Sequence, residues 1–337
     1  MRLLLIAFTL AMSMATHAQD WPAKPVRIVV PFPPGGAADA LPRIIAERLA
    51  AKWNQPFVID NRPGASGTIG TELFSRAEPD GYTLLSTPPA PLVINPSLYA
   101  KLPYDPAQFV PVSVMASIPS VLLVHPKVAA DTVKELIFLI RSNPGRFNYA
   151  SQGSTTVSFL TTEMFIAAAD GLKITHVPYK GTAPALAAVL AGETELFFDN
   201  LGTSLQHVRA GRLKALAVCG ERRHASLPEV PAMNEIYPGF VSVAWFGVAA
   251  PPKTPGAIAE KLSLAIGEIL RMPEVQKRLA ALSAEPIGSS PAEMARLMKQ
   301  DAERWRGVIR VAGVKPDRKS TRLNSSHLKL SRMPSSA

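Results

Sequence analysis

From residue 26 onward, short β-rich runs alternate with amphipathic stretches, and this alternation restricts the fold more than any other feature of the chain. VRIVV is followed by a predicted helix near residues 39–53, then by PFVID, a helix near 67–77, and YTLLS. Such alternation is typical of βαβ units on a largely parallel sheet. The first part of the chain is therefore predicted to be one α/β unit.

A second series of the same kind follows VLLVHP at residues 121–126. Thr132 and Glu135 have the spacing of a capping box at the first helix of this series. The predicted helices are 133–142, 155–168, 183–191 and 204–210, and the predicted strands are FNYAS, KITHV, ELFFD and LKALAV. The sequence thus predicts two α/β units.

After residue 250 the pattern predicts three helices with no strand between them, near 255–271, 273–283 and 291–312. Ser290, Pro291 and Glu293 mark the start of the last one. A purely helical ending has no core of its own, so we expect it to pack on the first α/β unit.

That return requires two crossings between the units, predicted near Val121–Pro126 and near Val241–Ala250. Two strand-like crossings would form a hinge that lets two lobes close on a cleft. Two independent domains in series are the alternative, but they would leave the last helices without a partner.

The chain begins with Arg2, an apolar stretch from Leu3 to Met12, and small residues up to Ala18. This layout predicts a secretory signal peptide, residues 1–18, that is cleaved after Ala18. A membrane anchor is the alternative, but the apolar stretch is shorter than the ~20 residues that span hydrocarbon. The mature protein is therefore expected to be soluble and outside the cytoplasm.

The formal net charge of +10 comes largely from the two ends of the chain. Residues 318–337 carry five Lys or Arg and no acid, and Arg2 leaves with the signal peptide, so residues 19–317 hold +4. Without a basic stripe interleaved with aromatic residues, the sequence gives no case for nucleic acid as a partner. Residues 318–337 lack hydrophobic periodicity and are predicted to be a disordered tail, which resembles translated sequencing-adapter read-through rather than native sequence.

Residues suited to catalysis do not form a recognisable constellation. The histidines have no metal-pair spacing, and the sequence contains no GxSxG, GxGxxG or GK[ST] motif. Cys219 lies in the apolar run LKALAVCG and is interpreted as a buried hydrophobe, with a reactive thiol as the less favoured alternative. The sequence therefore predicts no enzyme, no metal site and no cofactor.

Four predicted strand-to-helix turns are rich in Gly, Ser and Thr, namely PFPPGG, RPGASGTIG, SQGSTTVS and GTAPA. Ligands bind at this end of α/β sheets, and helix starts offer backbone N–H groups that suit a carboxylate. Asp39 and Pro42 are expected in the first turn of the helix after PFPPGG. Ser66 or Thr68 is expected to cap the helix after RPGASG. Taken singly, each turn is also explained by ordinary helix capping.

The PFPPGG turn is the best candidate for a pocket wall. Its prolines fix φ and remove N–H donors, so the strand before it ends abruptly in a rigid loop. Gly35 and Gly36 lack a Cβ, which lets the backbone approach a ligand closely.

Several stretches resemble one family: WPAKPVRIVVPFPPGGAAD, NRPGASGTIG, PDGYTLL, INPSLYAKLPYDP, NYASQGS, HVPYKGTAPAL and FDNLGTSLQHVRAGRLKALAV. They are similar to the Bug family of periplasmic solute receptors, the binding-protein component associated with tripartite tricarboxylate transporters. The resemblance extends from about Trp21 to Asp317. It implies an α/β, two-lobe periplasmic binding protein of type II with two hinge crossings. Residues 19–124 and 241–317 would form lobe 1, and residues 125–240 would form lobe 2.

The resemblance further implies a monomeric receptor that closes on a small carboxylated molecule and presents it to membrane transporter subunits. A ligand sensor for a membrane kinase and a periplasmic enzyme on the same fold are the alternatives. Asp39 is equally consistent with a ligand contact and with a capping role. Carried onto this sequence, the ligand-binding residues would be Phe32, Pro33, Gly35, Gly36, Ala37, Asp39, Ser66, Thr87, Ser154, Thr155, Thr156 and Asp199.

Two departures from the family pattern bear on the ligand. The PPAPL segment at residues 88–92 stands where small polar residues are usual, and Phe159 stands where a histidine commonly follows the Ser/Thr cluster. Both changes make the predicted pocket less polar. They favour a ligand with one carboxylate and an apolar or aromatic body over citrate.

Overall fold

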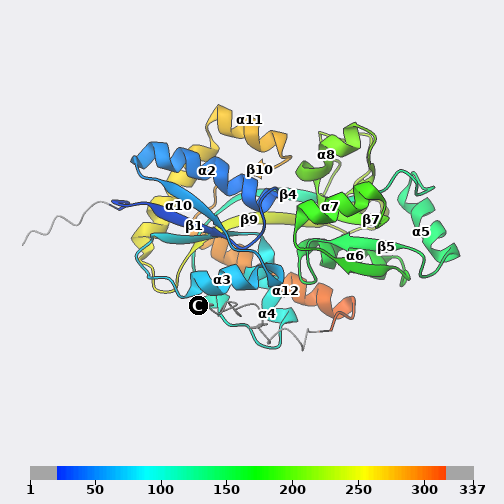
Figure 1. The fold of residues 1–337 in the computed structure, drawn as a ribbon, viewed down its shortest axis with the longest axis horizontal. Helices are drawn as coiled ribbons and strands as arrows, with labels where there is room; N and C mark the ends of the chain where they lie inside the picture. Colours follow the sequence, from blue (N-terminus) through cyan, green and yellow to red (C-terminus); the bar gives the residue numbers. More distant parts are fainter. Residues whose placement is uncertain (1–20, 316–337) are drawn as a thin grey trace, which may run out of the picture.

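The structure is a computed structural model that describes residues 21–315. The predicted signal peptide and the predicted tail lie outside the described residues. The chain forms two α/β lobes that lie side by side and are joined by long strands (Figure 1). None of the helices within residues 21–315 combines the length and the apolar character that a membrane-spanning segment requires.

The first lobe begins with the predicted βαβ alternation. β1 pairs in parallel with both β2 and β3, as the alternation predicts. The elements before the first crossing are β1 (Val26–Val30), α2 (Ala37–Trp53), β2 (Phe57–Asn61), η2 (Ala65–Gly67), α3 (Thr68–Ser75), β3 (Thr83–Thr87), the π-helical turn η3 (Ala90–Ile94), α4 (Asn95–Leu98) and η4 (Pro106–Gln108).

The second lobe repeats this arrangement around β5, which pairs in parallel with β6 and β7. It has an apolar core of its own, which includes Leu136, Tyr149, Phe165 and Phe198. Its elements are α5 (Val133–Ser142), β5 (Asn148–Ser151), α6 (Val157–Ala168), β6 (Thr175–Pro178), α7 (Thr182–Ala191), β7 (Leu196–Asn200), α8 (Leu201–Arg209), β8 (Lys214–Val218) and α9 (Met233–Ile236).

Both lobes share the long strand β4 (Val110–Val124). Up to Pro119 it pairs with β9 (Val243–Ala250), and from Ser120 onward it pairs with β7 and β8. The sheet runs in the order β2-β1-β3-β9-β4-β7-β5-β6, with β8 and β10 also paired to β4. The first crossing therefore lies at the change of partner, just before the predicted position at Val121–Pro126. The proposed lobe boundaries remain a prediction.

The last helices return to the first lobe, as predicted. α10 (Gly256–Leu270) packs on α2 and β4, α11 (Pro273–Ala281) contacts α2, and α12 (Pro291–Val311) packs on β4 and η3. The prediction that no strand separates them is wrong, since β10 (Glu285–Pro286) pairs antiparallel with β4. α12 also contacts α6 of the second lobe, so it spans the junction between the lobes (Figure 1).

Both predicted capping boxes are present. The Thr132 side chain accepts a hydrogen bond from the Glu135 N–H at 3.1 Å, and the Glu135 carboxylate accepts from the Thr132 N–H at 3.2 Å. The same reciprocal pair forms between Ser290 and Glu293 at the start of α12. Each box satisfies N–H groups that have no partner inside the helix, which fixes where the helix begins.

Two predictions about helix starts in the first lobe are wrong. α2 begins at Ala37, so Pro42 lies in the second helical turn rather than the first. Neither Ser66 nor Thr68 caps α3, because the cap position is Gly67 with a φ of 90°. A left-handed cap favours glycine over a hydroxyl side chain.

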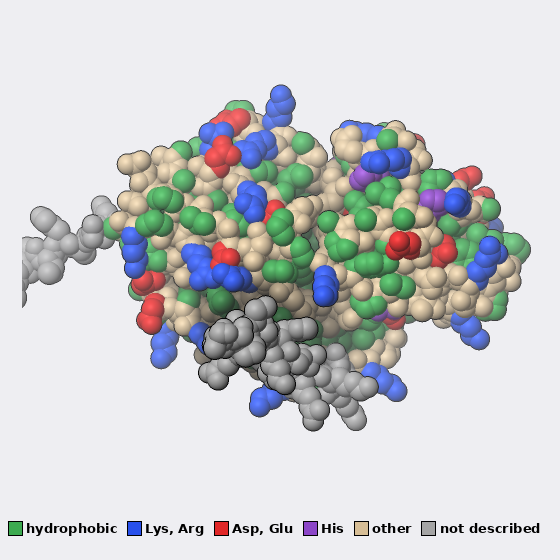
Figure 2. Space-filling model, viewed as in Figure 1, with side chains coloured by type: hydrophobic (Ala, Val, Ile, Leu, Met, Phe, Trp, Pro, Cys, Tyr) green, Lys and Arg blue, Asp and Glu red, His purple; other side chains and the backbone are tan. Residues whose placement is uncertain are grey.

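Charged side chains do not gather into one patch on the face shown in Figure 2, where acidic and basic groups are scattered over both lobes. Several of them pair between elements of the first lobe, as in the ion pairs Arg278–Glu47 at 2.7 Å and Lys52–Glu268 at 2.6 Å. This face therefore carries no basic stripe.

Candidate ligand-binding pocket

A pocket lies where the two lobes meet, at the ends of several strands. The space between its lining residues is about 590 Å³ when the open solvent at its mouth is included. The residues on its first-lobe side are Phe32, Pro33, Gly36, Ala38, Pro88, Ala90, Ala244 and Phe246. Those on the second-lobe side and on the first crossing are Ser120, Gln152, Thr156, Val157, Ser158, Thr182, Phe198, Asp199 and Asn200.

Four helices begin at this pocket. Gly36 is the cap residue of α2, Thr156 that of α6 and Asn200 that of α8, while Thr182 is the first residue of α7. None of these four helices has a side-chain hydrogen bond at its cap. Because the first N–H groups of a helix lack intrahelical partners and the helix dipole is positive there, such ends attract anions. The pocket is therefore suited to a negatively charged group.

Side-chain cations do not contribute to this preference. Among the described residues that line the pocket, none is lysine, arginine or histidine. Apart from Asp199, the polar side chains of the lining are hydroxyls and amides, which carry no charge. They belong to Ser120, Gln152, Thr156, Ser158, Thr182 and Asn200.

Asp199 supplies a carboxyl group to the lining, and its side chain is almost fully buried. It accepts hydrogen bonds from Gln152 Nε2 at 2.9 Å and from Thr203 Oγ1 at 2.6 Å. Burial raises the pKa of Asp199 to about 7, although these hydrogen bonds oppose the rise. The group therefore titrates near neutral pH and can hold a proton while a ligand carboxylate is bound.

The remaining lining is apolar, with Phe32, Phe198 and Phe246 as its largest side chains. From the PPAPL segment, Pro88 and Ala90 line the pocket. The segment thus adds carbon surface and no side-chain donor, as the sequence predicts. Such a lining suits the hydrocarbon part of a ligand.

Five of the residues predicted to bind the ligand line this pocket together: Phe32, Pro33, Gly36, Thr156 and Asp199. Two more lie along a neighbouring groove between α2, α7 and α8, namely Gly35 and Ala37. The other predicted residues lie outside both linings: Asp39, Ser66, Thr87, Ser154 and Thr155.

Asp39 is bound within its own lobe. Its carboxylate accepts hydrogen bonds from the Gly35 N–H at 3.3 Å and from Asn61 Nδ2 at 2.9 Å, and it pairs with Arg43 at 2.8 Å. Burial alone would raise its pKa, but the hydrogen bonds from Arg43 and Asn61 outweigh burial and hold the pKa below its usual range. The carboxylate therefore fixes the loop before α2 and does not cap the helix, whose cap residue Gly36 has no side-chain hydrogen bond.

Two of the predicted residues make contacts between the lobes. Thr155 Oγ1 donates to Asn95 Oδ1 at 2.7 Å, which joins the start of α6 to the first lobe. Ser66 lies against Gly153 so closely that a Cβ on this glycine would be 2.7 Å from Ser66 Oγ. These contacts belong to lobe closure rather than to the pocket lining.

The remaining two lie apart from these contacts. Ser154 is exposed, and Thr87 is buried with its hydroxyl donating to the carbonyl of the adjacent Pro88.

Glycines mark two further places where the lobes touch. A Cβ on Gly36 would lie 2.9 Å from Thr182 Oγ1, and a Cβ on Gly202 would lie 1.7 Å from the Leu282 carbonyl oxygen. Since real Cβ atoms do not approach other atoms so closely, these two positions require glycine in the arrangement described. The lobes are therefore closed on each other.

A Ser–His pair lies near the pocket but does not form part of its lining. Ser151 Oγ is 2.6 Å from His176 Nε2, and Ser151 is fully buried. The His176 ring packs between Tyr149 and Phe159, at ring distances of 4.8 and 4.7 Å. Burial lowers the pKa of His176 to about 4, so the ring is neutral. A serine without access to a substrate does not serve as a nucleophile, and the pair is a structural contact.

The described residues also show neither a metal site nor an accessible thiol. Within residues 21–315, no three His, Cys, Asp or Glu side chains come together as a metal site. Cys219 is fully buried, as interpreted from the sequence, and burial raises the pKa of its thiol. A buried, protonated thiol is unreactive.

Sequence reasoning missed most of the second-lobe side of the pocket. Three of the missed residues lie in turns that the sequence singles out: Gln152, Ser158 and Thr182. Their position at predicted helix starts could have identified them as pocket residues. Ser120 and Phe246 belong to the crossing strands β4 and β9. No motif marks these two residues, because the pairing of distant strands brings them to the pocket.

Comparisons with known proteins agree with this geometry. The family model described as "Tripartite tricarboxylate transporter family receptor" matches residues 41–314. Three solved structures are similar. "R. palustris Rpa4515 with adipate" is 37% identical with a TM-score of 0.85, covering 88% of this chain and 100% of that chain. The "periplasmic binding protein BugD" is 33% identical with a TM-score of 0.83, covering 88% and 99%. "MatC (Rpa3494) from Rhodopseudomonas palustris with bound malate" is 31% identical with a TM-score of 0.81, covering 86% and 100%.

These likenesses confirm the predicted two-lobe α/β fold of a type II periplasmic binding protein and the predicted resemblance to the Bug proteins. The family match covers most of the chain, from α2 to the end of α12. The chain therefore belongs to the family of tripartite tricarboxylate transporter receptors, whose members are solute-binding proteins of the periplasm.

Proposed function

We propose that this protein is a periplasmic receptor that binds a small carboxylated molecule between its lobes and presents it to the membrane subunits of a tripartite tricarboxylate-type transporter. The predicted signal peptide at residues 1–18 supports its export. In this proposal the receptor is a monomer without catalytic activity. Phe32, Pro33, Gly36, Thr156 and Asp199 contact the ligand, and Gly35 and Ala37 border the entrance.

One observation carries the proposal: four helices begin at a pocket whose described lining contains no side-chain cation. Backbone N–H groups at helix starts recognise a carboxylate by direction as well as charge. The hydroxyl of Thr182 adds a donor of the same kind. A neutral ligand would not gain the electrostatic attraction of these four helix starts.

The body of the ligand is proposed to be apolar. Three phenylalanines and the proline-rich segment surround the space beside the helix starts. The similar receptors are described with adipate and with malate, and adipate combines carboxylates with a chain of methylene groups. We therefore expect adipate or an aromatic monocarboxylate to fit this pocket better than the more polar malate or citrate.

Binding would work by closure. The ligand contacts both lobes, and a ligand that binds the closed form more tightly than the open form shifts the population toward closure. The hinge is formed by the crossings at Pro119–Ser120 and at Val241–Ser242. The membrane partner would then recognise the closed shape.

A thermal-unfolding experiment tests this proposal. Adipate at about 100 times its dissociation constant should add about 2.7 kcal/mol of stability, because it binds the folded chain and not the unfolded one. For a chain of this size that corresponds to a rise in melting temperature of roughly 4 °C. Benzoate, malate and citrate are compared in the same buffer.

Adipamide is the matched control ligand, since it has the same length and no charge. It should leave the melting temperature unchanged. The proposal fails if none of the acids raises the melting temperature, or if adipamide does so as strongly as adipate.

A further inference from the structure

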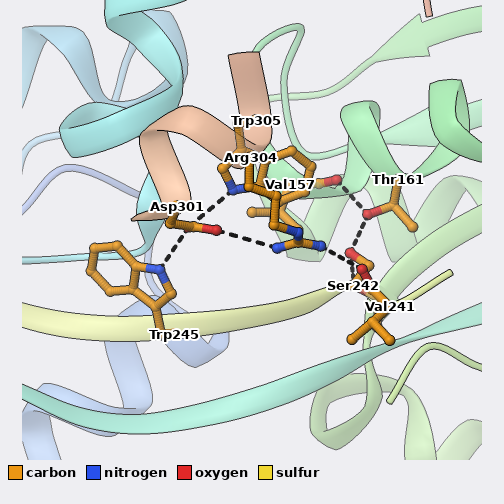
Figure 3. Close-up of polar contacts among 9 residues, drawn as sticks. Val157, Thr161, Val241, Ser242, Trp245, Asp301, Arg304 and Trp305 are labelled. Atoms are coloured by element: carbon orange, nitrogen blue, oxygen red, sulfur yellow. Dashed lines mark hydrogen bonds and ion pairs between the residues drawn. The ribbon is translucent and has the colours of Figure 1, made fainter. Parts of the chain in front are cut away.

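The surface of β9 that faces away from the pocket is held by a buried polar cluster on α12 (Figure 3). Asp301 of α12 accepts hydrogen bonds from Trp245 Nε1 at 2.8 Å and from Trp305 Nε1 at 3.0 Å. Arg304, one turn later on the same helix, pairs with Asp301 at 3.2 Å. Asp301 is buried, so these contacts are shielded from water.

Arg304 also reaches the second crossing between the lobes. One of its guanidinium nitrogens donates a hydrogen bond to the Val241 carbonyl, and its guanidinium carbon lies 4.6 Å from the centre of the Trp305 ring. A guanidinium presents N–H groups on separate nitrogens to two oxygens and its planar face to an aromatic ring, whereas an ammonium is one compact donor centre. Arg304 therefore fixes Val241 relative to α12 (Figure 3).

The second lobe holds the next residue of the same crossing. Ser242 Oγ shares a hydrogen bond of 2.5 Å with Thr161 Oγ1 of α6. The Ser242 carbonyl accepts from the Ser120 N–H of the other crossing at 3.0 Å. Val241 and Ser242 are thus held from the first lobe through Arg304 and from the second lobe through Thr161.

The same short segment leads into the pocket. Side chains along a strand point alternately to opposite faces. Ala244 and Phe246 line the pocket, and Trp245 between them points to the other face and contacts Asp301. The Asp301–Arg304 pair therefore lies behind the pocket wall that Ala244 and Phe246 form, without touching the pocket itself.

We propose that Arg304 is a positioning residue for ligand binding, which holds the Val241–Ser242 crossing in the geometry that closes the lobes. Its effect on acid binding rests on the function proposed above, whereas its effect on lobe closure does not. Loss of the guanidinium would free Val241 and shift the ligand-free protein toward open arrangements. Part of the binding free energy would then be used to close the lobes, so the apparent affinity for the ligand would fall.

The variant Arg304→Met tests this inference, because methionine keeps the apolar stem and removes both charge-assisted hydrogen bonds. The Arg304 side chain is 37% exposed, and Asp301 retains its two indole donors, so the variant should fold. We expect about tenfold weaker adipate binding. Arg306→Met is the matched control, since Arg306 is exposed on the same helix.

Spin labels report closure without any ligand. Cysteines replacing Lys134 on α5 and Lys277 on α11 place one label on each lobe, and the native Cys219 is fully buried and does not compete. In Arg304→Met the inter-label distances should become longer and broader than in the unmodified chain and in Arg306→Met. Arg304→Lys, which keeps the charge but lacks the planar fork with donors on separate nitrogens, should give intermediate distances.

Unchanged distances together with an unchanged dissociation constant in Arg304→Met would overturn the inference, even if its melting temperature fell. That outcome would assign the cluster to the stability of α12 alone. If none of the tested acids binds the unmodified chain, the proposed function fails, while the inter-label distances still decide the role of Arg304.

Discussion

Changing Gly202 to alanine is expected to weaken adipate binding about 100-fold without unfolding either lobe. Gly202 lies in the first turn of α8, and a Cβ there would be 1.7 Å from the Leu282 carbonyl oxygen of the first lobe. A backbone oxygen cannot rotate away as a side chain can, so the lobes cannot take up the closed arrangement. Within α8 itself alanine is the better helix former, by up to about 1 kcal/mol.

The measurement is isothermal titration with adipate, accompanied by circular dichroism and thermal unfolding of the ligand-free protein. Gly307→Ala is the matched control, because it makes the same change inside α12 where a Cβ would meet nothing within 4 Å. The control should bind adipate like the unmodified chain. Equal affinity of Gly202→Ala and the control would show that adipate is bound without this contact between the lobes.

The second large effect is expected in the pH dependence of stability, and it depends on Asp199. Its pKa is about 7 in the folded protein and near the ordinary value of 3.8 in the unfolded chain. Below pH 3.8 both states hold the proton, so the carboxyl group costs no stability. As pH rises toward 7 the unfolded state releases its proton first, so the free energy of unfolding falls. At 1.36 kcal/mol for each pKa unit, the loss approaches about 4 kcal/mol above pH 7.

Asp199→Asn should remove this loss, since the amide keeps the size of the side chain and carries no charge. The free energy of unfolding in urea is measured at pH 5 and pH 8 without ligand. The unmodified chain should lose several kcal/mol more stability over this range than Asp199→Asn. Asp170→Asn is the control, because its side chain is 91% exposed. Parallel pH profiles for the unmodified chain and Asp199→Asn would contradict a buried, proton-holding carboxyl group.

The fold was largely predictable because local signals agree with the tertiary structure. The capping box at Thr132 and the amphipathic stretch after it place α5 at Val133–Ser142, which are its predicted bounds. β10 was missed because Glu285–Pro286 has no strand propensity of its own and becomes a strand by pairing with β4. The full length of β4 was hidden by Pro111 and Pro119, which in most strands would mark an end.

The pocket was predictable where it is built from loops that follow strands. The turns after β1 and β5 supply Phe32 and Thr156, and their composition marks them in the sequence. Asp199 lies within β7 and was predicted only from the family resemblance. Neither Asp39 nor Thr155 is distinguishable from these by composition, since whether a polar group faces the ligand or a neighbour depends on how the lobes pack. Arg304 lies more than 60 residues from Val241 in the chain, and no local pattern joins them.

The position of β9 in the sheet sets the order in which the two lobes can be completed. β9 lies between β3 and β4, yet it is made only after the entire second lobe. Until residues 243–250 are available, β3 and β4 expose unpaired edges, and the first lobe depends on contacts between distant parts of the chain. The second lobe, in contrast, is nearly continuous in sequence, so its folding does not require β9. The amino-terminal half of the chain therefore lacks the strand that completes its sheet until residues 243–250 have been made.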